Sequence, residues 1–135
     1  MYLISNEITG KKYQKLEMVK EKYVVHEKFA IARSARKTLR FIEKNTTNFP
    51  NEHKVLKERT IYACYDILEN IYRANIFQDI SIKKEIVVKI QMLNFYLEES
   101  LRKNLMTEKK FISYSNHLLE LDKMIRKWCS YETKE

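Results

Sequence analysis

The chain has 135 residues, a common size for one domain, and 44% of them are hydrophobic, which is enough for one core. Its 26 Lys and Arg residues outnumber 18 Asp and Glu residues, giving a formal net charge of +8. Such a charge attracts polyanions such as nucleic acid, although a Lys-rich composition can also reflect the base composition of a genome. The only glycine and proline, Gly10 and Pro50, are too few for a β-rich fold, so the composition predicts an all-α protein.

Cysteine content and hydropathy exclude several classes of protein. Cys64 and Cys129 are too few and too far apart for a disulfide framework or a zinc site, and we expect both to be small buried side chains. No stretch approaches the roughly 20 apolar residues of a membrane span. Residues 1–7 lack the order of a signal peptide, so we expect a cytoplasmic protein that does not enter the membrane.

The first half of the chain predicts an arm and two helices. Residues 1–15 show no clear period and predict a partly ordered N-terminal arm, whereas residues from about 16 to 44 have helical periodicity. Residues 45–50 end this helix, and Pro50 is suited to open a second one that runs to about Asn75. The expected core positions of the two helices are Val25, Phe29, Ala32, Ala35, Leu39 and Ile42, then Leu56, Thr60, Ala63, Ile67, Ile71 and Ala74.

The second half predicts two more helices. Ser81 is a candidate N-cap for a helix from Ile82 to about Asn104, and Thr107 is a candidate N-cap for the last one. We expect a polar end from Ser130, frayed over 132–135. The expected core positions are Ile86, Ile90, Leu93, Leu97 and Leu101, then Phe111, Tyr114, His117 or Leu118, Leu121, Ile125 and Trp128. Four helices with short connections predict an antiparallel up-down four-helix bundle over 16–131.

No constellation of catalytic residues is visible. A di-iron bundle needs Glu-x-x-His pairs, and the nearest match is the reversed pair His117 and Glu120. A helical ribonuclease of the HEPN type needs an Arg, then four to six intervening residues, then a His, a spacing that none of the three histidines has. Phosphate-cradling loops need several glycines. We therefore expect no enzyme activity, no metal and no cofactor. A helical toxin or nuclease is the third alternative.

Basic residues form one strip on the first helix. No acidic residue lies between Glu27 and Glu43, although like charges at this spacing repel. A polyanion would relieve that repulsion, and arginine binds phosphate oxygens in pairs; the alternative is an ordinary solvated face. The strip consists of Arg33, Arg36, Lys37, Arg40 and Lys44.

Six further basic residues are weaker candidates for nucleic-acid binding. Lys123, Arg126 and Lys127 lie near the end of the last helix, where the helix dipole already favours cations. Isolated basic side chains often only reach from the edge of a core to water, although they can also line a channel or a subunit interface. The isolated ones are Arg59, Arg73 and Arg102.

Aromatic residues could stack on bases, but many recur at helical spacing. We therefore expect most of this set to lie in the core or in an interface: Phe29, Tyr65, Tyr72, Phe95, Tyr96 and Phe111.

Residues 49–54, which open the second helix, and residues 72–75, which end it, resemble the second helix of the Avd-like four-helix bundle proteins. Residues 97–102, 105–107 and 110–111 are similar to that family's third helix, turn and fourth helix. The closing segment up to Trp128 is similar too, except that Arg126 and Lys127 stand where many relatives have glycines. Members of this family are accessory variability determinants of diversity-generating retroelements, related to proteins encoded within 23S ribosomal RNA intervening sequences.

The resemblance implies a homopentamer with basic surfaces. It also implies a protein that binds a reverse transcriptase and its template RNA, and that supports mutagenic cDNA synthesis without catalysing it. The alternative is a structural oligomerisation or protein-interaction bundle without a specific RNA role.

Overall fold

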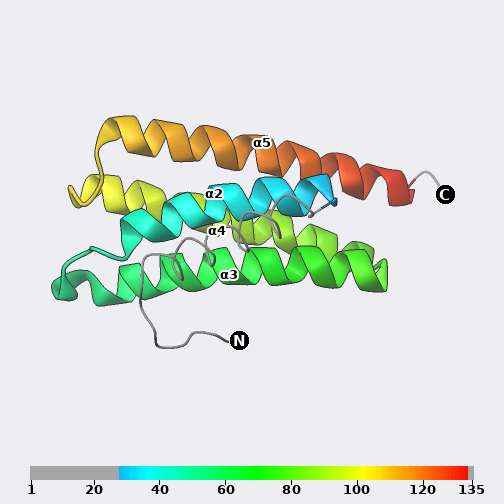
Figure 1. Ribbon diagram of the computed structural model, residues 1–135, viewed down its shortest axis with the longest axis horizontal. Coiled ribbons are helices and arrows are strands. Elements are labelled where there is room, and N and C mark those ends of the chain that lie inside the picture. The colour runs from blue at the N-terminus through cyan, green and yellow to red at the C-terminus, as the bar shows by residue number, and fades with distance from the viewer. Residues whose placement is uncertain (1–27, 134–135) are drawn as a thin grey trace, which may run out of the picture.

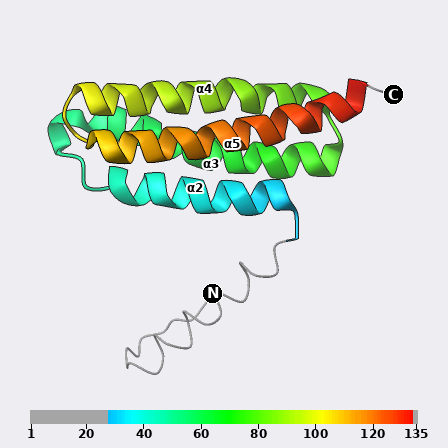
Figure 2. The same ribbon diagram turned by 90° about the horizontal axis from the view of Figure 1, so that it is seen from above.

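The computed structural model describes residues 28–133, which form four antiparallel helices (Figures 1 and 2). They are α2 (Ala30–Thr46), α3 (Lys54–Phe77), α4 (Ile80–Arg102) and α5 (Glu108–Thr133), with the short 3-10 helix η1 (Asn51–His53) before α3. Each helix packs against the next in sequence, and α2 also packs against α5, which closes the bundle. The expected all-α four-helix bundle is confirmed. The expected arm at 1–15, the expected helical residues 16–27 and residues 134–135 lie outside the described part.

One apolar core fills the space between the four helices. Its residues recur every three or four positions on each helix, so that every helix turns one face inward. The fully buried side chains include Ile42, Ile67, Ile71, Ile86, Leu93, Leu97, Leu121 and Ile125. Most expected core positions are therefore buried. On α5, Leu118 is buried and His117 is exposed, which settles the alternative that the periodicity left open.

The helix boundaries differ from the expected ones in three places. Pro50 is extended, with ψ 154°, and precedes η1 instead of opening a helix. The N-cap of α4 is Asp79 and not Ser81: Asp79 Oδ1 accepts hydrogen bonds from the backbone N and the hydroxyl of Ser81. A carboxylate two residues earlier can accept both donors, so the helix begins sooner. Helix α5 continues through Ser130 to Thr133, so this part of the expected polar end is helical.

Two connections depend on residues with positive φ. Gln78 ends α3 with φ 53° and ψ 44°, and its N–H donates to the carbonyl of Ala74. Asn104 has φ 58° after α4, where its N–H donates to Leu101 O and the N–H of Leu105 donates to Ser100 O. This pair of bonds is the Schellman arrangement, usually built on glycine. Thr107 then caps α5, as expected, by accepting from the backbone N of Lys110 at 3.2 Å.

The end of the bundle where α2 begins contains a buried lysine. The Lys83 side chain on α4 is only 1% exposed, and its Nζ lies 4.4 Å from the centre of the Trp128 ring on α5. Phe29, just before α2, packs edge-on against the same ring, with centroids 5.2 Å apart. A cation over an indole face is stabilised by the ring quadrupole. Three helices therefore meet around Trp128.

Candidate nucleic-acid interface

The basic strip lies on the outward face of α2. Arg33, Lys37, Arg40 and Lys44 are exposed and Arg36 is half-buried, whereas the residues that α2 buries face the opposite side of the helix. From Arg33 to Lys44 the strip runs about 16 Å at 1.5 Å per residue. All five predicted residues are thus brought together on one surface.

The edge of α2 next to α3 is fixed by two tyrosines. Arg36 Nε donates to the hydroxyl of Tyr72 at 2.8 Å, and the guanidinium carbon lies 5.7 Å from the centre of that ring. Glu43, the only acidic residue in α2, accepts a hydrogen bond from the hydroxyl of Tyr65. This bond is also the main cause that raises the pKa of Tyr65. Glu43 is thereby held at the α3 side of the helix, away from the centre of the strip.

The middle of the strip carries three cations that no described carboxylate pairs with. Within residues 28–131, Lys37, Arg40 and Lys44 form no ion pair with a carboxylate. Three like charges within two turns of helix repel one another. Their positive charge is therefore open to a ligand from solvent.

The cluster near the end of α5 is different, because two of its three cations are paired locally. Arg126 Nε lies 2.7 Å from Asp122 Oδ2, and Lys123 Nζ lies 3.8 Å from Glu120 Oε1. These pairs span one helical turn and reduce the net charge that a ligand would meet. Lys127 is exposed.

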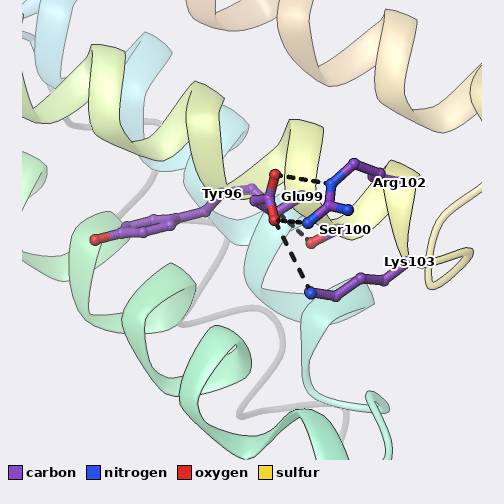
Figure 3. A network of polar contacts seen from close by, with 5 residues as sticks. All are labelled: Tyr96, Glu99, Ser100, Arg102 and Lys103. Carbon is purple, nitrogen blue, oxygen red and sulfur yellow. Dashed lines mark hydrogen bonds and ion pairs between the residues drawn. The ribbon is translucent and has the colours of Figure 1, made fainter.

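Arg102 is paired in the same way at the end of α4. Its Nη2 lies 2.6 Å from Glu99 Oε1 and its Nε donates to Glu99 Oε2 at 3.2 Å, while Lys103 Nζ approaches Oε1 at 4.0 Å (Figure 3). The hydrogen bond from Arg102 is the main cause that lowers the pKa of Glu99. This bidentate contact holds the Arg102 side chain against its own helix.

The two remaining candidates lie on α3, not on α2. Arg73 is exposed on α3, with its guanidinium carbon 5.4 Å from the centre of the Phe77 ring. Arg59 lines a groove of about 590 Å³ between α3 and α4. Neither joins the surface that Arg33 to Lys44 forms.

That groove is lined by exposed apolar side chains and by charges of both signs. Exposed apolar side chains from the two helices line it: Val55 and Tyr62 on α3, Val88 and Met92 on α4. Three acidic and two basic residues lie among them, namely Glu58, Asp66, Glu85, Arg59 and Lys89. In a chain with a net charge of +8, this surface is unusual in not being basic.

Sequence periodicity did not single out Phe41, which is 49% exposed on α2 beside Arg40. It lines a cavity of about 150 Å³ between α2 and α5, together with Thr38, Ser113, Tyr114 and His117. The sequence does indicate that Phe41 is exposed, because it lies two residues after the core position Leu39 and therefore off the buried face of the helix. The cavity itself depends on how closely α5 packs against α2, and this packing cannot be predicted from the sequence of α2.

Most of the other expected placements of aromatic and sulfur side chains hold. Phe29, Tyr72, Tyr96 and Phe111 are half-buried, but Tyr65 and Phe95 are exposed. Cys64 is buried, as expected, whereas Cys129 is only half-buried. Among residues 28–133 there is no group of three or more His, Cys, Asp or Glu side chains placed to hold a metal ion. No helix in this range is long and apolar enough to cross a membrane.

Comparisons with known proteins add no family assignment. No family model matches the chain, and no curated protein shows significant similarity to it. The basic surface of α2 is therefore the feature that best indicates a function.

Proposed function

We propose that this protein binds RNA through the α2 strip, as a non-catalytic accessory protein. The observation that carries the proposal is the set of three exposed cations, Lys37, Arg40 and Lys44, which have no carboxylate partner among the described residues. Two of the other candidates, Arg102 and Arg126, are instead paired within their own helices. A phosphate backbone would neutralise the strip and remove its internal repulsion.

The experiment is to reverse the charge of these three residues together, as Lys37→Glu, Arg40→Glu and Lys44→Glu, and to measure RNA affinity against salt concentration. Each phosphate contact contributes about 0.7 to the slope of log K against log salt for a single strand, so three lost contacts lower it by roughly 2. Because the three side chains are exposed, the fold should be retained, which circular dichroism checks.

The matched control makes the same change in net charge elsewhere, at the exposed residues Lys54 of α3, Lys84 of α4 and Lys103 just after α4. Exposed charges separated by more than about 8–10 Å from the ligand are largely screened at physiological salt, so the control should lose little affinity. If the strip variant and the control bind RNA equally well and with equal salt slopes, the α2 strip has no role in binding.

The finer form of the proposal names the partners. The sequence resemblance to Avd-like proteins supports a cytoplasmic protein that assembles with a reverse transcriptase and its template RNA. In that setting it would support mutagenic cDNA synthesis in a diversity-generating retroelement, and it would itself carry out no chemical step. Co-purification of this protein with a reverse transcriptase encoded beside it, with and without the template RNA, tests this form. Failure to recover a complex under either condition would contradict it.

The groove between α3 and α4 favours a second candidate role, in which copies of the chain associate through this face. Burying Val55, Tyr62, Val88 and Met92 would remove apolar surface from water, and the mixed charges of the groove would not repel a second copy as the α2 strip would. The resemblance supports a homopentamer. Sedimentation of the protein and of a Val88→Ser, Met92→Ser variant tests the role. A monomer in both cases excludes it, whereas dissociation of the variant alone supports it.

A further inference from the structure

An exposed phenylalanine lies inside the strip that we propose binds RNA. Phe41 follows Arg40 directly, and Lys37 and Lys44 lie four residues before it and three residues after it, about one turn away on each side. A single exposed apolar side chain is common on protein surfaces. Here, however, Lys37 and Lys44 lie one helical turn to either side of the ring, so a base attached to a phosphate that they bind could reach the ring.

The cavity beside Phe41 can accommodate part of a base. Its volume of about 150 Å³ is smaller than the usual pockets for small molecules, which are roughly 300–1,000 Å³. The cavity can therefore hold one edge of a flat ring but not a whole nucleotide. The cavity lies between α2 and α5, so a base inserted there would contact both helices.

The walls of the cavity carry hydrogen-bonding groups. His117 Nδ1 lies 2.8 Å from the carbonyl oxygen of Ser113, and since a carbonyl only accepts, Nδ1 is the donor. In the neutral ring Nε2 is then an acceptor, able to receive an N–H from a base edge. The hydroxyls of Thr38 and Ser113 line the same space and can donate or accept.

One cation of α5, Lys110, is held against the end of α2. Lys110 Nζ donates to Asn45 Oδ1 at 2.8 Å, which fixes this ammonium between the two helices near Tyr114. Tyr114 accepts a hydrogen bond from the same amide through Asn45 Nδ2, and burial raises the pKa of its phenol.

We propose that Phe41 and this cavity hold one unpaired base of an RNA strand whose phosphates lie along the α2 strip. The protein then prefers single-stranded to double-stranded RNA, because bases in a duplex are stacked and cannot reach a ring on the protein surface. This inference rests on the proposed function, and it adds the form of RNA and the side chain that recognises it.

The test measures fluorescence anisotropy of a labelled short RNA, offered as a single strand and as a duplex of the same sequence at constant salt. Phe41→Ala should weaken single-strand binding by roughly 5- to 150-fold, the range for loss of one base–aromatic stack. It should leave duplex binding unchanged. Phe41→Leu keeps most of the apolar volume but has no aromatic face. It should preserve the packing around position 41 and still lose most of the single-strand affinity.

The matched control is Phe77→Ala. Phe77 is another exposed phenylalanine next to an arginine, 59% exposed at the end of α3, but it does not line this cavity. The inference is overturned if Phe41→Ala and Phe77→Ala bind single-stranded RNA equally well, or if wild-type protein binds duplex as tightly as single strand. Loss of binding by the Lys37, Arg40, Lys44 variant alone would then leave the proposed function standing. If that variant also binds normally, the proposed function fails as well.

Discussion

Arg36 is held against Tyr72 by both a hydrogen bond and the face of the ring, so one member of the basic strip is anchored to the neighbouring helix. Arg40, one turn further along α2, is exposed and pairs with no carboxylate in the described part of the chain. The two arginines have the same charge but different surroundings. They should therefore contribute differently to stability and to RNA binding.

Arg36→Ala should destabilise the fold more than Arg40→Ala, because it removes a part-buried hydrogen bond, which contributes about 0.5–1.5 kcal/mol in typical proteins. Arg40→Ala should instead weaken RNA binding more, because its side chain is free to contact phosphate. Urea denaturation and anisotropy measure the two effects on the same proteins. Variants that rank in the same order in both measurements would contradict this division.

Gln78→Gly should stabilise the protein. Gln78 has φ 53°, a conformation that is unfavourable for a residue with a Cβ by about 1–2 kcal/mol and is natural for glycine. Part of this gain is offset by the greater freedom of glycine in the unfolded chain and by loss of the exposed Gln78 Nε2 bond to Asn75 O. We expect a net gain of about 0.5 kcal/mol by urea denaturation.

The comparison variant is Asn104→Gly. Asn104 also has positive φ, at 58°, but asparagine tolerates this region better than glutamine does. Its gain should be smaller than that of Gln78→Gly. A lower denaturation midpoint for Gln78→Gly would show that the side chain of Gln78 contributes more than its backbone conformation costs.

Capping of α4 by Asp79 should make stability depend on pH. Hydrogen bonds from Ser81 lower the pKa of the Asp79 carboxyl in the folded protein. A lowered pKa means that the contribution is present above the unfolded value, about 3.9, and is lost as the pH falls through the folded value. Asp79→Ala should therefore be less stable than wild type at pH 7, with a difference that shrinks in acid.

Asp79→Asn is the control for this effect, because asparagine is also a good N-cap but does not ionise. Its stability relative to Asp79→Ala should stay constant over the same pH range. Chemical denaturation at several pH values measures all three proteins. A difference between wild type and Asp79→Ala that does not change with pH would contradict a role for the ionised cap.

Cys64 should be unreactive in the folded protein. Burial, with a smaller contribution from Glu43, raises the pKa of its thiol to about 12, and the thiolate is the reactive form. In a Cys129→Ser variant, a disulfide reagent such as DTNB should react only when the protein unfolds. The Cys64→Ser variant keeps half-buried Cys129 and should react faster. Rapid reaction of Cys64 at neutral pH would show that α3 opens locally.

The bundle was predictable because helical periodicity is a local property of the sequence. Ile67, Ile71 and Ala74 recur at spacings that leave one face of α3 apolar, and these residues are buried. The start of α4 was less predictable, since Asp79 and Ser81 are both good N-caps and the hydrogen bonds decide between them.

The candidate site was only partly predictable for a related reason. The basic strip depends on α2 alone, so its five residues follow from spacing. The pairing of Arg126 with Asp122 also lies within one helix and could have been anticipated from their i,i+4 spacing. The cavity beside Phe41, in contrast, requires Ser113 and His117 from a helix about 70 residues away in sequence, and its shape follows from packing.

The convergence of Phe29, Lys83 and Trp128 gives the protein a built-in optical reporter. Trp128 is the only tryptophan in the chain, so its emission comes from one place, the end of the bundle where α2 starts. The Lys83 ammonium over the indole makes that emission sensitive to small displacements. A short RNA that contacts only Phe41, Lys37 and Lys44, towards the other end of α2, should leave the spectrum unchanged, whereas separation of α2 from α4 and α5 should shift it. Unlabelled protein can thus distinguish occupancy of the strip from opening of the bundle.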